Sequence, residues 1–271
     1  MADDAPARSA AVAPPHRGVL CLHGFAGTRV EIQPVADTLA RRGYDVEVPL
    51  LAGHGIDVAT LENTGWEAWL RSAEAALDAL VARTGGPVAI VGFSMGGLLA
   101  LALACRAPER IAALVILSAP FRLRRSRAFG IRLLAGLPRW ARRGPLRAMP
   151  KMRGSDVGHP DLRGKVLGLP AMPIQGLIAL LDLIAHVRAE VARGRVVAPT
   201  LIVHGRRDRT APFAASVELA RALGTVAAPP LWLERSQHIV ALDVEQDALF
   251  EAIARFLDGH ARWSTATAPH P

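Results

Sequence analysis

Lysine, aromatic residues and cysteine are all scarce in this chain of 271 residues. All but two of its 32 basic residues are arginine, and only 5% of its residues are aromatic. A net charge of +8 raises the question of a nucleic-acid partner. However, no basic stretch carries the interleaved aromatic side chains on which bases stack. We therefore expect no nucleic-acid partner, and we attribute the arginine excess to compositional bias.

Long apolar runs are also missing, so we expect no integral membrane span. The acidic first residues are not followed by the apolar segment of a signal peptide. The two cysteines, Cys21 and Cys105, lie in apolar stretches typical of reduced core residues. Neither has a Cys or His at metal-ligand spacing. These absences predict a cytoplasmic protein that uses neither a metal nor a cofactor.

Hydrophobic residues make up 51% of the chain, which is ample for one sizeable core. Short apolar, β-branched runs alternate with stretches of helical periodicity. This alternation predicts an α/β fold with a mostly parallel sheet and helices on both faces. The expected strands are 18–22, 44–48, 87–92, 111–117, 200–204 and 230–234, and the expected helices are 31–42, 64–83, 95–106, 174–191, 214–223 and 245–257.

The alternation is interrupted between residues 121 and 197. The first part of this stretch, to Lys151, is crowded with Arg, Pro and Gly and shows no strand pattern. We therefore predict one core domain made of 17–120 and 198–260, with 121–197 inserted as a small helical cap or lid. The Ala/Pro-rich residues 1–16 and the last residues, 261–271, are expected to be flexible tails.

A Gly-Phe-Ser-Met-Gly stretch at 92–96 joins an apolar strand to the helix that follows it. In such a context a sharp turn lifts the serine oxygen, here that of Ser94, above the end of the sheet. A side chain at Gly92 or Gly96 would collide with neighbouring backbone where the chain reverses so tightly. Ser94 is therefore a candidate nucleophile, and the alternative is an ordinary glycine-rich turn.

Two further polar residues follow later strands in the order that such a serine requires. Asp208 follows strand 200–204 and His238 follows strand 230–234, and open α/β sheets place their sites at the carboxyl ends of strands. His238 would take the serine proton while Asp208 orients the imidazole. Taken alone, Asp208 could equally form a surface ion pair with a neighbouring arginine, and His238 could be a solvent-exposed histidine of a loop. All three in this order favour the triad.

The negative oxygen that forms on attack requires two backbone donors. One is expected from Met95, the residue after the nucleophile, and the other from Phe25 in the glycine-rich loop after the first strand. The Phe25 ring is expected to line the acyl side of the site or to pack on the cap. His23, two residues earlier, is interpreted as a structural residue of that loop.

Five segments of the sequence carry a family resemblance: LHGFAGT (22–28), GHG (53–55), GFSMGG (92–97), HGRRDRTAP (204–212) and ERSQHIVALD (234–243). With these segments the chain resembles the α/β-hydrolase superfamily and, more narrowly, the bacterial carboxylesterases and monoacylglycerol lipases, over about residues 18–258. The resemblance implies the α/β-hydrolase fold, a triad of Ser94, Asp208 and His238, and an oxyanion hole at Phe25 and Met95. The chain departs from the pattern in its arginine-rich cap and at position 237, where a glutamine replaces the usual glycine.

We therefore expect a serine hydrolase that cleaves carboxylic esters through an acyl-enzyme on Ser94. The apolar face of helix 174–191 predicts a slot for a hydrophobic acyl chain, with Phe25, Ile174, Leu177 and Leu181 as candidate binding residues. The alternative is that this face only packs the cap onto the sheet. A short or medium acyl ester or a monoacylglycerol is the expected small-molecule partner.

Two other functions stay open at this point. The same triad hydrolyses thioesters, lactones or C–C bonds on other scaffolds, and eleven basic residues between Arg122 and Arg153 could steer an acidic substrate such as an acyl-carrier or CoA thioester. A non-catalytic protein could instead use this basic cap to bind a membrane surface or another anionic partner. A solvated charged face is the simpler interpretation of the same residues.

Overall fold

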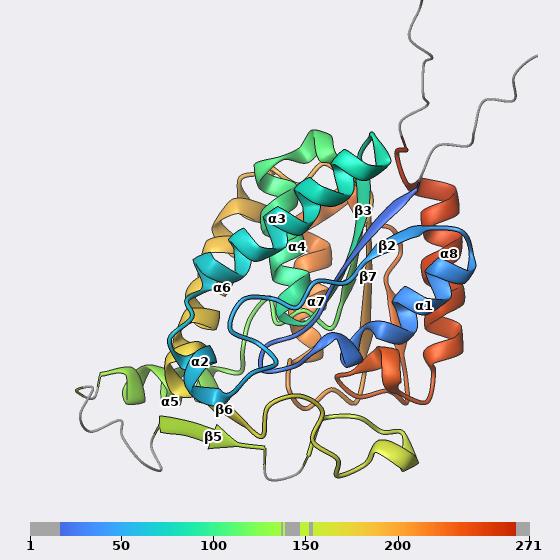
Figure 1. Cartoon of the computed structure of the whole chain (residues 1–271). Coiled ribbons are helices and arrows are strands. Elements are labelled where there is room, and N and C mark those ends of the chain that lie inside the picture. The colour runs from blue at the N-terminus through green and yellow to red at the C-terminus, as the bar shows by residue number, and fades with distance from the viewer. Residues whose placement is uncertain (1–16, 137, 139–146, 152–153, 264–271) are drawn as a thin grey trace, which may run out of the picture.

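The computed structural model describes residues 17–136, 138, 147–151 and 154–263 (Figure 1). The expected N-terminal tail, 1–16, lies outside the described residues. So do most of the expected C-terminal tail, 264–271, and several arginines of the inserted segment. The structural statements below concern the described part of the chain.

The described start of the expected C-terminal tail contacts the body of the protein. The Arg262 N–H donates to the Ala112 carbonyl at 2.9 Å. The Trp263 ring lies 6.0 Å from the Tyr44 ring. Residues 261–263, which directly follow the last helix, therefore contact Ala112 and Tyr44.

A fully parallel six-stranded sheet lies at the centre of the molecule, with the strand order β2-β1-β3-β4-β7-β8 (Figure 1). The two central strands, β3 and β4, are buried along their whole length. A strand covered on both faces needs an unbroken apolar run, which is what these two strands have. The bounds are β1 Gly18–Leu22, β2 Asp45–Glu47, β3 Val88–Phe93, β4 Ile111–Leu117, β7 Thr200–Gly205 and β8 Leu231–Leu233.

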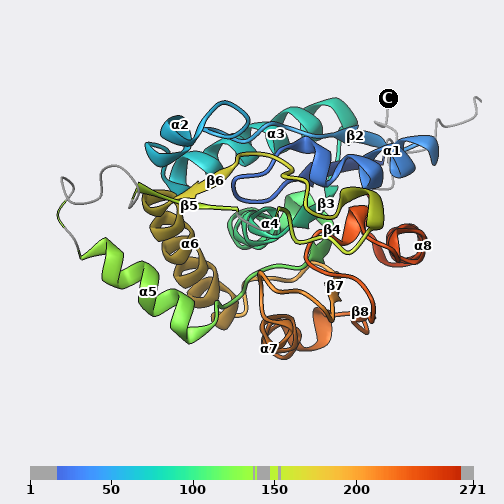
Figure 2. The ribbon, with the colours of Figure 1, turned by 90° about the horizontal axis from the view of Figure 1, so that it is seen from below.

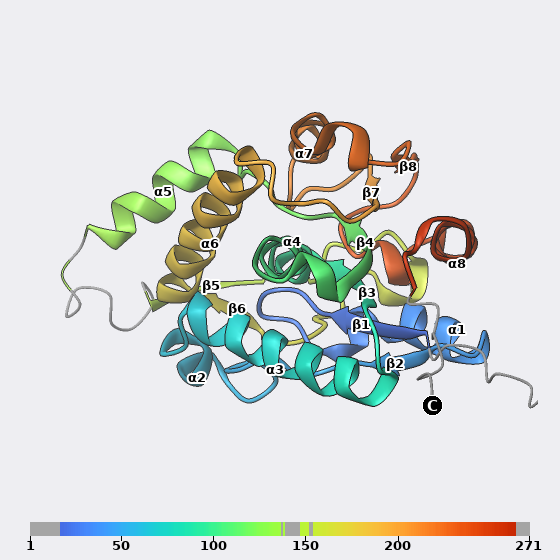
Figure 3. The ribbon, with the colours of Figure 1, turned by 90° about the horizontal axis from the view of Figure 1, so that it is seen from above.

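Helices cover both faces of the sheet (Figures 2 and 3). Helices α1 and α8 share a core with Ala89 and Val91, whereas α3, α4 and α7 share a core with Val88 and Ile90. The alternation follows because successive strand residues point to opposite faces. The α-helices of these layers are α1 Gln33–Arg41, α2 Val58–Glu62, α3 Trp66–Thr84, α4 Met95–Arg106, α7 Phe213–Leu223 and α8 Gln246–His260, and the short 3-10 helices are η1 Arg29–Glu31, η2 Pro108–Arg110, η5 Gly224–Val226 and η6 Val240–Leu242. The predicted sheet with two helical layers is confirmed.

Between β4 and β7 the chain leaves the sheet and forms α5, β5, η4, β6 and α6. In Figure 1, α5, β5 and β6 lie along the lower part of the molecule and α6 rises along its left side. The expectation of no strand before Lys151 is wrong, because β5 pairs antiparallel with β6 and sets Met149 opposite Met172. Each strand has only three residues, too few to show a period in sequence. The bounds are α5 Arg125–Ala135, β5 Ala148–Pro150, η4 Pro160–Leu162, β6 Ala171–Pro173 and α6 Ile174–Ala192.

The turn between β3 and α4 packs against the end of β1 with no room for a side chain. A Cβ built on Gly96 would lie 2.3 Å from the Leu22 carbonyl oxygen, and one on Gly92 would lie 2.3 Å from the Gly96 carbonyl oxygen. Both neighbours are backbone atoms, which cannot rotate away. The expected collision at these glycines is therefore present, and glycine here is what brings the turn and the β1 loop together.

We predict that Gly96→Ala destabilises the fold by about 1–3 kcal/mol, because the backbone of β1 has to move. Gly130→Ala is the control, since a Cβ there meets nothing within 4 Å in helix α5. Alanine in a helix should raise the free energy of unfolding by up to ~1 kcal/mol. Urea unfolding measures the free energy of unfolding of both variants. A Gly96→Ala midpoint equal to that of the unmodified protein would contradict the close approach.

Candidate active site

Three loops that follow strand ends bring Ser94, Asp208 and His238 together. The Nε2 atom of His238 lies 3.0 Å from the Ser94 Oγ, and its Nδ1 atom lies 2.7 Å from the Asp208 Oδ2. All three residues are buried. A serine, a base within hydrogen-bond reach and an acid that orients the base form the arrangement that activates a hydroxyl nucleophile.

The backbone of Ser94 is in a conformation that non-glycine residues seldom adopt, with φ 53° and ψ −116°. Its N–H donates to the Leu117 carbonyl at 2.8 Å, which ties the turn to the end of β4. Helix α4 begins at the next residue, so its free N–H groups and dipole favour negative charge there. The strained turn thus presents the Ser94 oxygen above the sheet.

The Asp208 carboxylate sets the tautomer of His238. An ionised carboxylate only accepts hydrogen bonds, so the His238 Nδ1 carries the proton and Nε2 is free to accept from Ser94. The Thr210 and Ala211 N–H groups each donate to Asp208 Oδ1 at 2.8 Å. Burial alone would raise the pKa of Asp208, but the charge of His238 and hydrogen bonds from two histidines hold this pKa well below its usual range.

Charged groups from three segments act on the His238 imidazole. Burial alone would lower the pKa of His238, but the Asp208 carboxylate, followed by Asp156 and Glu31, raises it above its ordinary value. Asp156 also contacts this loop through its backbone, because its carbonyl accepts from the N–H groups of His238 and Ile239 at 3.1 and 3.0 Å. The inserted segment therefore positions the loop that carries the candidate base.

The loop that contains Phe25 follows the end of β1, which lies against the start of α4, since a Cβ on Gly96 would meet the Leu22 and His23 carbonyls. Within the described chain, neither the Phe25 N–H nor the Met95 N–H donates a hydrogen bond, so both are available to an incoming oxygen. The neighbouring Ala26 has a positive φ of 54°. Its carbonyl accepts from the Leu169 N–H at 2.9 Å and the Lys151 Nζ at 3.1 Å. These two contacts hold the strained loop from the side of the inserted segment.

Glu31 is a buried carboxyl group at this loop that the sequence pattern did not single out. Its Oε2 accepts from the Gly24 N–H at 3.2 Å. Burial raises the pKa of Glu31 to about 7, although Lys151 and the Gly24 hydrogen bond act in the opposite direction. An acidic residue at the start of an expected helix is common, so only the folded chain distinguishes Glu31 from a surface residue.

A cavity of about 380 Å³ lies above Ser94 and His238. Of the four candidate acyl-binding residues, Phe25 and Leu177 line it, whereas Ile174 and Leu181 are not among its described lining residues. Ile174 instead packs with residues of α5 and α6 in a separate small core. The apolar part of the lining comes mostly from the inserted segment: Leu123, Ile131, Met149, Met172, Leu177 and Leu180.

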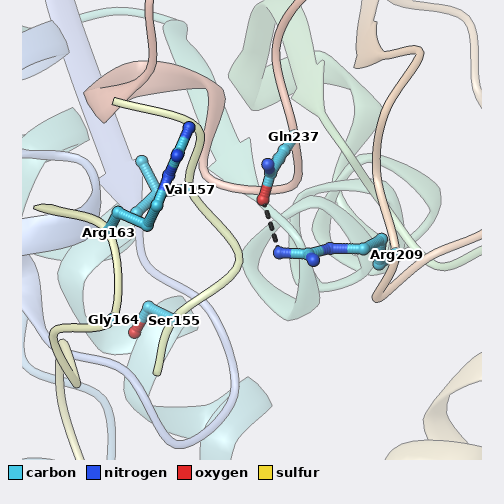
Figure 4. Close-up of a pocket in the computed structure, with 6 residues that line it drawn as sticks. All are labelled: Ser155, Val157, Arg163, Gly164, Arg209 and Gln237. Carbon is cyan, nitrogen blue, oxygen red and sulfur yellow. Dashed lines mark hydrogen bonds between the residues drawn. The ribbon is translucent and has the colours of Figure 1, made fainter. Parts of the chain in front are cut away.

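A second hollow, of about 340 Å³, lies beside the His238 loop (Figure 4). Gln237 lines this hollow, and its Oε1 accepts from an Arg209 guanidinium N–H at 2.8 Å. Arg209 also donates to Asp156 Oδ1 at 3.1 Å. The glutamine that departs from the pattern of similar enzymes thus contacts Arg209 and does not line the cavity above Ser94.

Two further buried histidines, His23 and His54, lie at the loop after β1 and the loop after β2. The His23 Nδ1 lies 3.0 Å from the Gly24 carbonyl, and the Leu51 N–H donates to its Nε2 at 3.1 Å. Burial lowers the pKa of His23 to about 4 and that of His54 to about 3, so both are neutral.

Among the described residues no group of His, Cys, Asp and Glu could hold a metal ion, and no helix is long and apolar enough to cross a bilayer.

We predict that Glu31→Gln moves the acidic limb of the kcat/KM profile to lower pH by a fraction of a pH unit. The base works only when neutral. In the fraction of molecules in which Glu31 is ionised, its charge raises the His238 pKa, so glutamine lets His238 lose its proton at slightly lower pH. Glutamine keeps an acceptor for the Gly24 N–H. Glu251→Gln, an exposed substitution on α8, is the control. A limb that stays in place or moves to higher pH would contradict the prediction.

Comparison with known proteins gives relatives over nearly the whole chain. The thermostable monoacylglycerol lipase of Bacillus sp. (strain H-257) is 30% identical over 244 residues, which cover 90% of this chain and 91% of the relative. The carboxylesterase of Bacillus subtilis (strain 168) is 27% identical over 242 residues, which cover 89% and 92%. Both proteins match the narrower group that the sequence blocks resemble.

A solved structure from work on LipS and LipT, two metagenome-derived lipolytic enzymes, superimposes with a TM-score of 0.78 at 28% identity and covers 90% of this chain and 94% of that one. The α/β-hydrolase fold predicted from the sequence is thereby confirmed. The family model described as serine aminopeptidase, S33, matches residues 13–245. The chain therefore belongs to the serine aminopeptidase S33 family of α/β-hydrolases.

Proposed function

We propose that this protein hydrolyses carboxylic esters through an acyl-enzyme on Ser94, with His238 as the base and Asp208 as the orienting acid. The observation that carries the proposal is the hydrogen-bonded line from Ser94 through His238 to Asp208, at 3.0 and 2.7 Å, at the base of a cavity. The two Bacillus relatives, a monoacylglycerol lipase and a carboxylesterase, support the same enzyme class, carboxylic ester hydrolase.

In the first half of the reaction, the Ser94 Oγ attacks the ester carbonyl carbon while the His238 Nε2 takes the hydroxyl proton. The carbonyl oxygen becomes negative and is stabilised by the N–H groups of Phe25 and Met95. When the tetrahedral intermediate collapses, the bond to the alcohol breaks and His238 gives its proton to the leaving oxygen. The acyl group stays on Ser94.

In the second half, water takes the place of the alcohol. His238 removes a proton from this water, which attacks the acyl carbon, and the same two N–H groups stabilise the oxyanion. Collapse releases the acid and returns the proton to the Ser94 Oγ. Asp208 stays ionised in both halves, which fits its depressed pKa, and stabilises the imidazolium each time it forms.

The proposed substrate is a short or medium acyl ester or a monoacylglycerol. The cavity fits this class because apolar side chains from α5, β5, β6 and α6 enclose one part of it, whereas Lys151, Asp156 and Thr210 give another part polar groups. The names of the two Bacillus relatives support the same range of esters. We propose that residues 121–197 act as the lid that closes the cavity. Of the four acyl-binding candidates, we keep Phe25 and Leu177.

A cytoplasmic location is part of this proposal. It rests on the two cysteines, Cys21 and Cys105, which are both free and buried. Burial raises the pKa of the Cys21 thiol to about 12, which leaves it protonated and unreactive. A protein with only unpaired, buried thiols fits a reducing compartment.

We predict that Ser94→Ala lowers kcat on p-nitrophenyl esters by roughly 10⁴- to 10⁶-fold with the fold intact, because the nucleophile is lost while substrate binding remains. A fluorophosphonate probe should label the unmodified protein at Ser94 and leave the variant unlabelled. Circular dichroism checks that the variant is folded. Turnover retained in Ser94→Ala, or labelling at another residue, would contradict the assignment of the nucleophile.

We predict that Leu177→Ala shifts the preferred acyl chain of p-nitrophenyl esters to greater length, because Leu177 lines the cavity and its truncation lengthens the apolar part. Leu181→Ala lies on the same helix outside the described lining and is the matched control. The comparison is kcat/KM over a series of chain lengths. Equal profiles for the two variants would remove Leu177 from the acyl site.

A further inference from the structure

We propose that His204 is a positioning residue of the triad, which acts through Asp208. Its Nε2 lies 3.0 Å from Asp208 Oδ2, the same oxygen that holds the His238 Nδ1 at 2.7 Å. One carboxylate oxygen therefore bridges two imidazoles. The inference rests on the proposed function, since it assigns a role in orienting the acid of that triad.

His204 is placed for this role by the sheet itself. It is the penultimate residue of strand β7 and is completely buried, with its ring 5.9 Å from the Phe213 ring in an edge-to-face contact. Its Nδ1 lies 2.6 Å from the Oγ of Ser216, a buried residue of α7. Both ring nitrogens thus have a polar partner in a site from which water is excluded.

The partners determine the tautomer of His204. The His204 Nε2 faces two acceptors, the Asp208 carboxylate at 3.0 Å and the Ala211 carbonyl at 3.4 Å, so Nε2 has to carry a hydrogen. In a neutral imidazole the Nδ1 is then an acceptor, and the Ser216 hydroxyl donates to it. Ser216 therefore keeps His204 in the form that can donate to Asp208.

The consequence for Asp208 is a carboxylate fixed by four donors. The N–H groups of Thr210 and Ala211 hold Oδ1, and the two imidazoles hold Oδ2. Without His204, the buried Oδ2 keeps only the hydrogen bond to His238, and the carboxylate is free to turn about its Cβ–Cγ bond. The imidazole of His238 then loses its fixed orientation toward Ser94, which lowers the rate of the chemical step more than the affinity for substrate.

His204 and His238 also share the electrostatic attraction of one Asp208 carboxylate oxygen. Removing His204 concentrates the interaction on His238 and stabilises the imidazolium, so His238 keeps its proton to higher pH. The other carboxylates that act on His238, Asp156 in the inserted segment and Glu31 after β1, are left unchanged. Because the base must be neutral to take the serine proton, the acidic limb of kcat/KM should move to higher pH.

The test compares three variants. His204→Leu fills the space without a donor, whereas His204→Gln places an amide N–H where the imidazole Nε2–H was. His186→Gln is the control, because this histidine contacts Trp66 on α3 and not the triad. We expect kcat of His204→Leu to fall about tenfold or more, the scale of one lost hydrogen bond to a charged group, with KM nearly unchanged and the acidic limb at higher pH. His204→Gln should recover most of kcat and the original limb.

Two results would overturn the proposal: a His204→Leu variant with unchanged kcat and limb, or leucine and glutamine variants that lose activity equally with no shift of the limb. If His204→Leu does not fold, Ser216→Ala tests the same contact, and it should lower kcat and move the limb in the same direction. Fluorophosphonate labelling separates the two levels of inference. An unlabelled unmodified protein refutes the proposed function, whereas equal labelling rates with and without His204 refute only the positioning role.

Discussion

A carboxylate that stays ionised inside the protein is the constraint on which the site depends. Asp208 is buried, and burial opposes its charge. The protein compensates with two backbone N–H groups and two imidazoles, all within hydrogen-bond distance of its oxygens. Each of these donors is held in turn. The Thr210 and Ala211 N–H groups belong to the loop after β7, the His238 loop is held by the Asp156 carbonyl, and His204 is held by Ser216. The charge of one carboxylate therefore depends on the conformation of several segments that are far apart in sequence.

The parallel sheet makes this convergence possible. Strands β3, β7 and β8 all end at the same edge, so the loops that follow them meet there. The close approach of Gly96 to the Leu22 carbonyl brings the loop after β1 to the same place. A parallel arrangement thus brings together the proposed nucleophile, acid, base and oxyanion donor from the ends of four strands. It does so without any of these residues being near another in the chain, apart from Ser94 and Met95.

The sequence predicts this much because the relevant pattern is local: a polar residue in the short loop after an apolar run. Ser94, Asp208 and His238 each lie in such a loop, so their convergence could be predicted, together with the fold. His204, Glu31 and Asp156 could not be, since their roles depend on contacts between segments distant in the chain. In the sequence, a histidine inside a strand such as His204 resembles any other buried residue, because its contact with Asp208 in the following loop becomes visible only in the folded chain.

The same reasoning explains the partial success at the cavity. Helical periodicity predicts that one face of α6 is buried, and that face is buried, but it does not say which neighbour covers it. Ile174 packs toward α5, whereas Leu177 and Leu180 line the cavity. The sequence shows which face of a helix is apolar. Which residues of that face line the cavity depends on how α4 and α5 pack against α6. Short strands such as β5 are missed for a related reason, because three residues carry no period.

The inserted segment is joined to the catalytic loops by hydrogen bonds, which gives it more than a covering role. Asp156 accepts from the backbone of His238 and Ile239, and Lys151 and Leu169 donate to the Ala26 carbonyl beside Phe25. The loop of the proposed base and the loop of the proposed oxyanion donor are therefore both held from the same segment. A substitution in this segment that breaks these hydrogen bonds would act on the proposed catalytic groups as well as on the lining of the cavity.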